Sequence, residues 1–370
     1  MAGFLAFFAR LGERLARPVD GMLMAAAMAL VGVGLVTLFS ATEENVARVT
    51  SQAASLGFAL VLMWIVANVS PQQLARAAVP LYAISVLLLV AVALGGTVVN
   101  HSRRWLNLGV GRFQPSELMK IALPLMLAWY FQKREARMNL GDFLIATILI
   151  AVPVWLIERE PDLGTALMVG ACGFYVLYLA GLSWKVMLAL GAAATAAVPL
   201  VWPHLHGYRQ ERILTFLDPS RDPLGAGYHS SQASIALGSG GVIGKGWLNG
   251  TQTHLDFLPE RHTDFIFAVF GEEFGLIGNA VLLVLYLLLI TRALVITANA
   301  STLFTRLLAG AITLMFFTYA FVNMAMVSGL LPIVGVPLPL VSFGGTALVS
   351  LFIGLGILMS VQANRKLVNT

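Results

Sequence analysis

The sequence has few charged residues and a single cysteine, and both shortages restrict what the protein can be. Only 11% of its 370 residues are charged, whereas soluble domains carry about 25%. Because Cys172 is the one cysteine, an intrachain disulfide is excluded. Its place in an apolar run also disfavours a cysteine-based metal site. The sequence also lacks zinc-spaced His/Cys clusters, a P-loop and a Gly-x-Ser-x-Gly elbow.

Hydrophobic residues are abundant instead, at 58% of the chain, with a mean hydropathy of +0.84. A hydrocarbon core about 30 Å thick needs roughly 20 apolar residues per helix, so the chain has room for about ten spans. We therefore expect an all-α polytopic integral membrane protein, forming one domain over residues 1–370. The apolar runs place its spans near 21–40, 52–69, 77–96, 117–131, 142–157, 163–181, 185–201, 265–290, 303–328 and 340–361.

Ten spans leave both termini on one side of the membrane, and the basic residues indicate which side. The terminal side holds Arg10, Arg14, Arg17, Arg76, Lys133, Arg134, Arg137, Lys185, Arg292, Arg306, Arg365 and Lys366, whereas the opposite short loops hold Arg48, Arg103, Arg104, Arg112 and Arg159. Cytoplasmic loops are enriched in Lys and Arg, so both termini are expected in the cytoplasm. The basic residues are scattered between apolar runs, which argues against nucleic acid as a partner.

The segment 202–264, between the seventh and eighth spans, is the large loop expected outside the cytoplasm. Its apolar residues favour packing against the outer mouth of the bundle, partly as interfacial helices. Its cations include Arg209, Arg212, Lys245 and Arg261. Arginine binds phosphate through paired hydrogen bonds, which makes a lipid diphosphate a candidate ligand. Simple attraction to anionic lipid headgroups is the competing explanation.

Ionisable residues inside apolar runs are costly and need a partner or a purpose. Glu117 and Lys120 are three residues apart, a spacing that puts both on one helix face and permits an ion pair. That pair either holds helices together or belongs to an outer polar cavity. Glu272 and Glu273 fall about two turns into the eighth span, where they either pair with buried cations or hold a proton.

Two carboxylates stand immediately before apolar helices. Asp162 opens the sixth span, and helix capping is the simplest interpretation of it. Asp264 is the last carboxylate before the eighth span, which places it at the membrane surface. It is either a capping residue or a partly desolvated general base.

Several motifs in this order resemble the SEDS family, named for shape, elongation, division and sporulation. They are RWL (104–106), QPSE (114–117) with Lys120, PDLGT (161–165), YRQERI (208–213), DPLGAGYH (222–229), LPERHTDFIF (258–267), and the closing stretch from GLLP (329–332) to SFGG (342–345). The likeness is strongest to the rod-shape branch of the family. Two positions depart from the pattern: Glu160 stands where Gln is usual, and Phe343 where Tyr is usual.

The resemblance implies a peptidoglycan glycosyltransferase of the inner membrane that joins lipid II units into β-1,4 glycan strands during elongation. It also implies a class B penicillin-binding protein as partner and a divalent cation, Mg or Mn, whose ligands cannot be read from the sequence. Asp264 would be the general base. The implied substrate-binding residues are Arg104, Trp105, Glu117, Lys120, Asp162, Arg209, Arg212, Lys245 and Arg261.

Two other classes of function remain open at this point. A flippase for lipid-linked precursors would depend on its deepest charges, Glu272 and Glu273. A scaffold that only recruits the penicillin-binding protein would not need Asp264. The concentration of polar motifs in the outer loop favours the polymerase.

The positive-inside pattern predicts that segment 202–264 and the loop near residue 136 lie on opposite sides of the membrane. Single cysteines placed at Ser220 and at Ala136 should therefore respond oppositely to an impermeant thiol reagent added from outside. Labelling at Ser220 alone is the expected result. Labelling of both positions would contradict the topology.

Overall fold

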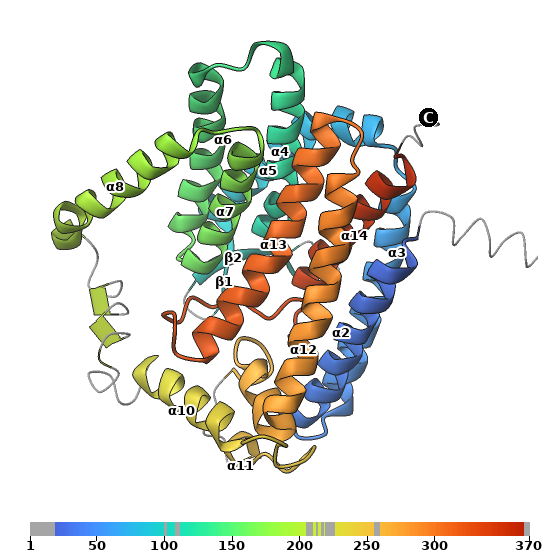
Figure 1. Ribbon diagram of the computed structural model, residues 1–370. Helices are drawn as coiled ribbons and strands as arrows, with labels where there is room; N and C mark the ends of the chain where they lie inside the picture. The colour runs from blue at the N-terminus through green and yellow to red at the C-terminus, as the bar shows by residue number, and fades with distance from the viewer. Residues whose placement is uncertain are drawn as a thin grey trace, which may run out of the picture.

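The computed structural model describes residues 19–99, 102–107, 112–204, 210–211, 214–215, 218, 226–254 and 260–365. In this part of the chain each predicted span is a helix (Figure 1), which confirms the polytopic all-α fold. These helices are α2 (Gly21–Ala41), α3 (Val46–Ala67), α4 (Pro71–Gly95), α5 (Pro115–Arg134), α6 (Leu140–Arg159), α7 (Leu163–Leu179), α8 (Trp184–Val201), α12 (Ile266–Ala298), α13 (Leu303–Val327) and α14 (Gly345–Ala363). A short 3-10 turn, η1 (Glu135–Arg137), joins α5 to α6.

The starts of the helices follow local capping chemistry. The side chains of Asp20, Asn45, Ser70, Asn139 and Thr302 each accept a hydrogen bond from a first-turn N–H, at the beginnings of α2, α3, α4, α6 and α13. Such caps satisfy N–H groups that have no partner within the helix. Seven of the helices are long and apolar enough to cross a membrane by length and composition. Helix α5 is not among them and carries charged residues at both ends.

Helix α13 lies at the centre of the bundle. It packs against α5, α7, α12 and α14, while α14 packs on α3, α4 on α5, and α2 on α12. Its buried side chains include Leu308, Phe316 and Tyr319. Because α13 has neighbours on several sides, its polar residues face protein. Helix α8, by contrast, projects away from the other helices (Figure 1).

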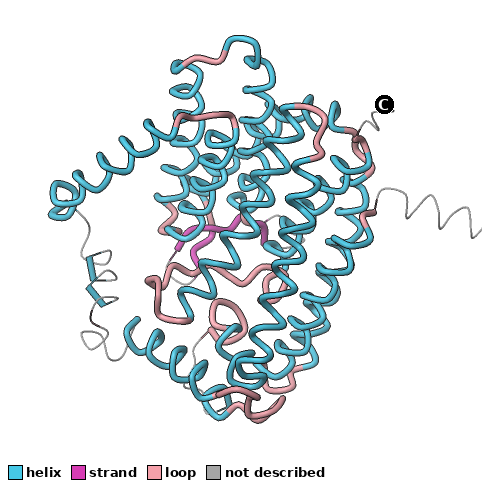
Figure 2. Tube along the Cα trace, in the orientation of Figure 1, coloured by secondary structure: helices cyan, strands magenta, loops and turns pink. Residues whose placement is uncertain are grey.

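A small antiparallel sheet lies between α4 and α5, and the apolar pattern of the sequence does not predict it. Its strands β1 (Thr97–Val99), β2 (Ser102–Asn107) and β3 (Arg112–Phe113) pair in the order β1-β2-β3. Thr97 is opposite Trp105, and Leu106 is opposite Phe113. Figure 2 shows these strands among the helices. Strand β2 carries two of the predicted substrate-binding residues, Arg104 and Trp105.

The predicted outer loop folds back onto the bundle, as its apolar residues suggest. It contains η2 (Trp202–His204), α10 (Ala226–Ser239) and α11 (Thr251–His254). Helix α10 packs against α12 and α13. The two short helices α10 and α11 lie at one end of the bundle (Figure 1).

Helix α12 is interrupted at Gly275, whereas the apolar run 265–290 predicts one unbroken span. Gly275 has φ 65° and ψ −161°, a conformation that only glycine adopts readily. The 240–246 turn lies against this break: Leu276 N donates to Gly241 O at 2.9 Å, and Lys245 N donates to Glu272 O at 3.0 Å. Glu272 therefore lies before the break, in the first part of α12, and not deep within a continuous span.

The segment 328–344, between α13 and α14, is not helical although residues 336–342 are mostly buried. Its prolines at 332, 337 and 339 interrupt helix formation. Side chains of other helices bind its backbone: Tyr286 Oη donates to Pro339 O at 2.6 Å, and Gln52 Nε2 donates to Ser342 O at 3.3 Å. Gly344 N in turn donates to Gln52 Oε1 at 3.2 Å. The buried polar backbone thus obtains partners from the surrounding bundle.

The break in α12 predicts that Gly275→Ala destabilises the protein. An added Cβ would overlap the backbone of Gly244, and the residue would have to hold a conformation that costs about 1–3 kcal/mol outside glycine. Thermal unfolding of the purified protein measures the loss. Gly57→Ala in α3 is the matched control, because a Cβ there meets nothing within 4 Å and helix propensity favours alanine. Equal unfolding temperatures for the two variants would contradict the prediction.

Candidate active site

A cavity of about 540 Å³ lies where β2, α5, the α6–α7 turn, the 260–264 segment, α13 and the 328–344 segment meet. It gathers six of the residues predicted from the sequence. They are Arg104, Trp105, Glu117, Lys120, Asp162 and Asp264. These residues come from widely separated parts of the chain, so the fold is what makes them one site.

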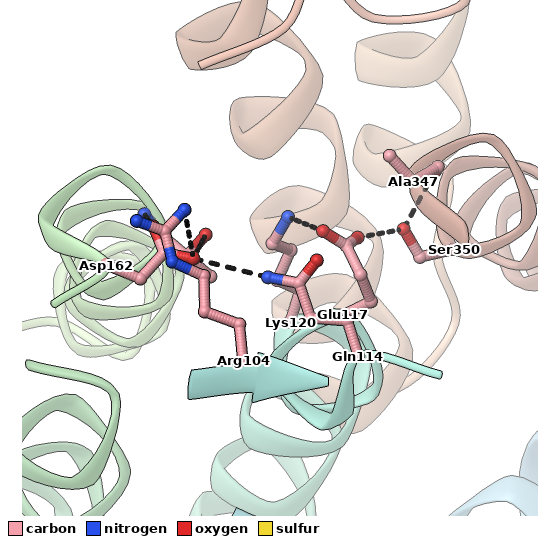
Figure 3. Close-up of polar contacts among 8 residues, drawn as sticks. Arg104, Gln114, Glu117, Lys120, Asp162, Ala347 and Ser350 are labelled. Carbon is pink, nitrogen blue, oxygen red and sulfur yellow. Dashed lines mark hydrogen bonds and ion pairs between the residues drawn. The ribbon is translucent and has the colours of Figure 1, made fainter. Parts of the chain in front are cut away.

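Glu117 and Lys120 form the predicted ion pair on α5 (Figure 3), and both line the cavity. Lys120 Nζ lies 2.6 Å from Glu117 Oε1, and both residues are buried, with 4% and 6% of their surface exposed. Ser350 Oγ of α14 donates to the other carboxylate oxygen at 2.7 Å. The Lys120 ammonium also lies 4.9 Å from the ring centre of Tyr319 on α13. The pair therefore links three helices and contributes polar groups to the cavity.

Asp162 both caps a helix and faces the cavity. Its Oδ1 accepts from Thr165 N at 3.1 Å at the start of α7, which confirms the capping interpretation. Its Oδ2 accepts from Gln114 Nε2 at 3.2 Å and lies 3.6 Å from Arg104 Nη1 (Figure 3). Arg104 also donates to Pro161 O at 2.8 Å. The half-exposed Arg104 guanidinium is thereby held at the wall of the cavity.

Asp264 lies at the cavity wall, directly before α12. The N-cap of that helix is Phe265 and not Asp264. A Cβ added at Gly335 would lie 3.5 Å from Asp264 Oδ2, so the carboxylate lies next to the 328–344 segment at the cavity wall. Glu260 and Thr263 of the same segment line the cavity as well.

The other predicted cations do not join this group. Lys245 Nζ lies 2.7 Å from Glu272 Oε1 and donates to Thr251 Oγ1 at 2.7 Å, away from the cavity lining. Arg261 forms an ion pair with Glu43 of the α2–α3 turn. Arg209 and Arg212 lie outside the described residues. Of the adjacent carboxylates, Glu272 has a cationic partner as expected, whereas Glu273 accepts from Ser40 Oγ.

Carboxylates outnumber cations in the described lining of the cavity. The acidic residues are Glu117, Glu158, Asp162, Glu260 and Asp264, whereas the basic residues are Arg104 and Lys120. Each of these cations is also paired with a carboxylate. Within the described residues, no group of three or more His, Cys, Asp or Glu side chains is placed to hold a metal ion. A preformed all-protein site for a divalent cation therefore does not fit this part of the chain.

Of the two departures from the SEDS pattern, Phe343 lines the cavity and Glu160 lies next to its lining residues Pro161 and Asp162. Glu160, in the α6–α7 turn, is 1% exposed, and neither of its carboxyl oxygens has a hydrogen-bond partner. Burial, followed by the nearby Asp162 charge, raises the pKa of Glu160 to about 8, although Arg104 opposes the shift. Phe343 N donates to His262 O at 2.9 Å, and its ring lies 5.9 Å from the His262 ring. Phe343 therefore packs against the segment that carries Asp264 without needing a hydroxyl.

Three polar residues near the site are not among those selected from the sequence: Tyr319, Asn323 and Ser350. Each lies in an apolar helix, where Ser and Tyr are ordinary residues. Asn323 carries the clearest signal, because an amide within an apolar span needs hydrogen-bond partners, as a charged side chain does.

Comparisons with known proteins agree with this architecture. The family model described as "Cell cycle protein", for FtsW, RodA and SpoVE, matches residues 20–367. The peptidoglycan glycosyltransferase MrdB of Escherichia coli strain K12 is 46% identical over 352 residues, 95% of each chain. The probable peptidoglycan glycosyltransferase FtsW of Trichlorobacter lovleyi is 36% identical over 362 residues, 94% of each chain.

Solved structures of two relatives have a similar fold. A chain from work on the coordination of polymerization and crosslinking by a peptidoglycan synthase complex aligns with a TM-score of 0.82 at 34% identity, covering 94% of this chain and 98% of that one. The rod shape determining protein RodA of Thermus thermophilus aligns with a TM-score of 0.72 at 31% identity, covering 94% and 97%.

The fold and the cavity together define a polytopic membrane protein with a carboxylate-rich site enclosed by its helices and two non-helical segments. With the family model matching nearly the whole chain, the protein belongs to the SEDS family, which comprises FtsW, RodA and SpoVE.

The raised pKa of Glu160 predicts a pH-dependent effect of Glu160→Gln. The stability that the neutral carboxyl provides is present below about pH 4.5 and is lost as pH rises through about 8. The glutamine protein should therefore be more stable than the parent at pH 8, by on the order of 2 kcal/mol, since one pKa unit is about 1.4 kcal/mol and the adjacent cavity screens part of the charge. Unfolding temperatures between pH 5 and pH 8 measure the difference.

The advantage of the glutamine protein should shrink toward pH 5. Glu135→Gln, at an exposed carboxylate in η1, is the control and should leave the pH dependence of unfolding unchanged. Parallel curves for Glu160→Gln and the parent would contradict a neutral Glu160.

Proposed function

We propose that the protein is a peptidoglycan glycosyltransferase that joins lipid II units into β-1,4 glycan strands, with Asp264 as the general base. Its membership of the SEDS family supports the reaction, because relatives at 46% and 36% identity are named peptidoglycan glycosyltransferases. The observation that carries the assignment of the base is the position of Asp264. Its carboxylate shares one cavity with Arg104, Lys120 and Asp162.

The reaction requires a base and a group that stabilises the leaving diphosphate on opposite faces of a sugar. The donor is an α-linked diphosphate and the product is β-linked, so a single displacement inverts the anomeric carbon. Asp264 would accept the proton of the acceptor's 4-hydroxyl as the oxygen attacks. Arg104 and Lys120 are the cations in the described lining, and guanidinium groups bind phosphate oxygens in pairs. Arg209 and Arg212 are proposed as further cations for the diphosphate.

The existing ion pairs limit what these cations can do alone. Lys120 is 2.6 Å from Glu117, whereas Arg104 is 3.6 Å from Asp162 and half-exposed. The looser contact makes Arg104 the cation better able to turn toward a phosphate. A divalent cation, Mg or Mn, remains a proposal. Because the described carboxylates form no ready metal site, such an ion would have to be held mainly by the diphosphate itself.

We place the protein in the bacterial inner membrane with both termini cytoplasmic and the cavity open to the opposite side, in agreement with the distribution of basic residues. A class B penicillin-binding protein is the proposed partner, since a structural neighbour comes from work on a complex that coordinates polymerization and crosslinking. Lys245 and Arg261, which form ion pairs outside the cavity, have structural contacts that suffice to explain them.

Asp264→Asn tests the proposed base. Asparagine keeps the size of the side chain but cannot accept the proton, so polymerisation of labelled lipid II by the purified protein with its partner should fall about 10²- to 10⁴-fold. Expression, unfolding temperature and partner binding should match the parent. Glu44→Gln, at an exposed carboxylate of the α2–α3 turn, is the control and should polymerise at the parental rate.

Near-parental polymerisation by Asp264→Asn would refute the base assignment. If polymerisation also did not depend on Arg104, the scaffold and the flippase would be the functions left to test.

A further inference from the structure

The amide of Asn323 joins the segment that carries Asp264 to the adjacent 328–344 segment. Asn323 lies on α13 and is 0% exposed. Its Nδ2 donates to Asp264 O at 2.8 Å and to Val336 O at 2.7 Å. One side chain therefore binds two non-helical segments at once.

These two segments are the ones whose spacing defines the position of the Asp264 carboxylate. Val336 follows Gly335, and a Cβ on Gly335 would lie 3.5 Å from Asp264 Oδ2. The Asn323 amide that binds Asp264 O therefore also binds Val336, the residue after the glycine that lies next to the carboxylate. A shift of either carbonyl would change the gap between the carboxylate and the 328–344 segment.

The neighbouring carbonyls are held in the same way. Thr263 O accepts from Ser342 Oγ at 2.6 Å, and Ser342 Oγ also accepts from Leu338 N at 2.8 Å. His262 O accepts from Phe343 N at 2.9 Å. Three successive carbonyls, from residue 262 to residue 264, are therefore fixed by groups of α13 and the 328–344 segment.

We propose that Asn323 is a positioning residue, which sets the location of the Asp264 carboxylate through the backbone and does not touch the substrate. The inference rests on the proposed function, because it assumes that Asp264 is the base. Asn323 is absent from the cavity lining, whereas Asp264 and Val336 are both part of it. The cations proposed to bind the diphosphate, Arg104 and Lys120, lie on β2 and α5 and donate to Pro161 O and Glu117 Oε1, not to Asn323.

Asn323→Ala is the direct test, measured as lipid II polymerisation by the full-length protein with its partner. Loss of both hydrogen bonds from Nδ2 should lower kcat about 10- to 100-fold, since displacing a catalytic base by about 1 Å lowers the rate roughly 10²-fold. The KM for lipid II should stay near the parental value, because the donor-side cations are undisturbed. Thr313→Val is the matched control on α13. Thr313 is also 0% exposed, and its hydroxyl donates within its own helix to Ala309 O.

A second measurement separates positioning from a general loss of structure. In an Asp264→Asn background, Asn323→Ala should cause no further fall in the residual rate, because there is no base left to misplace. A purely structural role predicts that the two losses multiply. Multiplied losses, or a parental kcat for Asn323→Ala, would overturn the proposal.

Ser342→Ala keeps the test decisive if Asn323→Ala does not fold. It removes the donor to Thr263 O, one residue before Asp264, and should lower kcat with little change in KM. A parental kcat for Ser342→Ala in that situation would overturn the proposal. The base assignment fails separately, through near-parental activity of Asp264→Asn, whatever the Asn323 variant does.

Discussion

Polar groups removed from water must find partners within the protein, and this constraint shapes the site as well as the bundle. Most of the chain meets it with helices, whose backbone groups pair internally. The segments 260–264 and 328–344 are not helical, so they depend on side chains such as Asn323, Gln52 and Tyr286. The same contacts that satisfy these backbones also hold the Asp264 segment in place. Stability and the geometry of the proposed base therefore rest on the same hydrogen bonds.

The charges of the cavity follow the same rule. Lys120 is neutralised by Glu117, and Arg104 faces Asp162, so a buried cation is not left alone before substrate arrives. The cost is an acidic cavity, which is a poor place for a diphosphate unless charges rearrange or further cations enter. This balance explains why a polymerase of this kind would benefit from Arg209, Arg212 or a divalent ion. The raised pKa of Glu160 follows the same rule, because its neutral form adds no charge beside Asp162.

The break at Gly275 divides helix α12 into two parts with different surroundings, although the apolar run 265–290 is continuous in the sequence. Its first part follows directly after Asp264 and carries Glu272 near its end, and the 240–246 turn binds it through backbone hydrogen bonds and Lys245. Its second part provides the longer apolar stretch. Glu272 forms an ion pair with Lys245, and Glu273 accepts a hydrogen bond from Ser40. These two carboxylates, on which a transport function would depend, do not line the cavity.

The sequence by itself determined the membrane character, the ten helices and most of their starts, because long apolar runs and caps such as Asp162 act locally, although α3 and α4 each begin six residues before the predicted spans. It also selected Arg104, Glu117, Lys120, Asp162 and Asp264, through ordered motifs and the cost of burying charge. Only the tertiary structure decided that these residues share a cavity while Lys245 and Arg261 pair elsewhere, and that Gly275 breaks α12. Those outcomes depend on contacts between segments far apart in the chain, such as Asn323 with Asp264 and Lys245 with Glu272. No local pattern encodes such contacts.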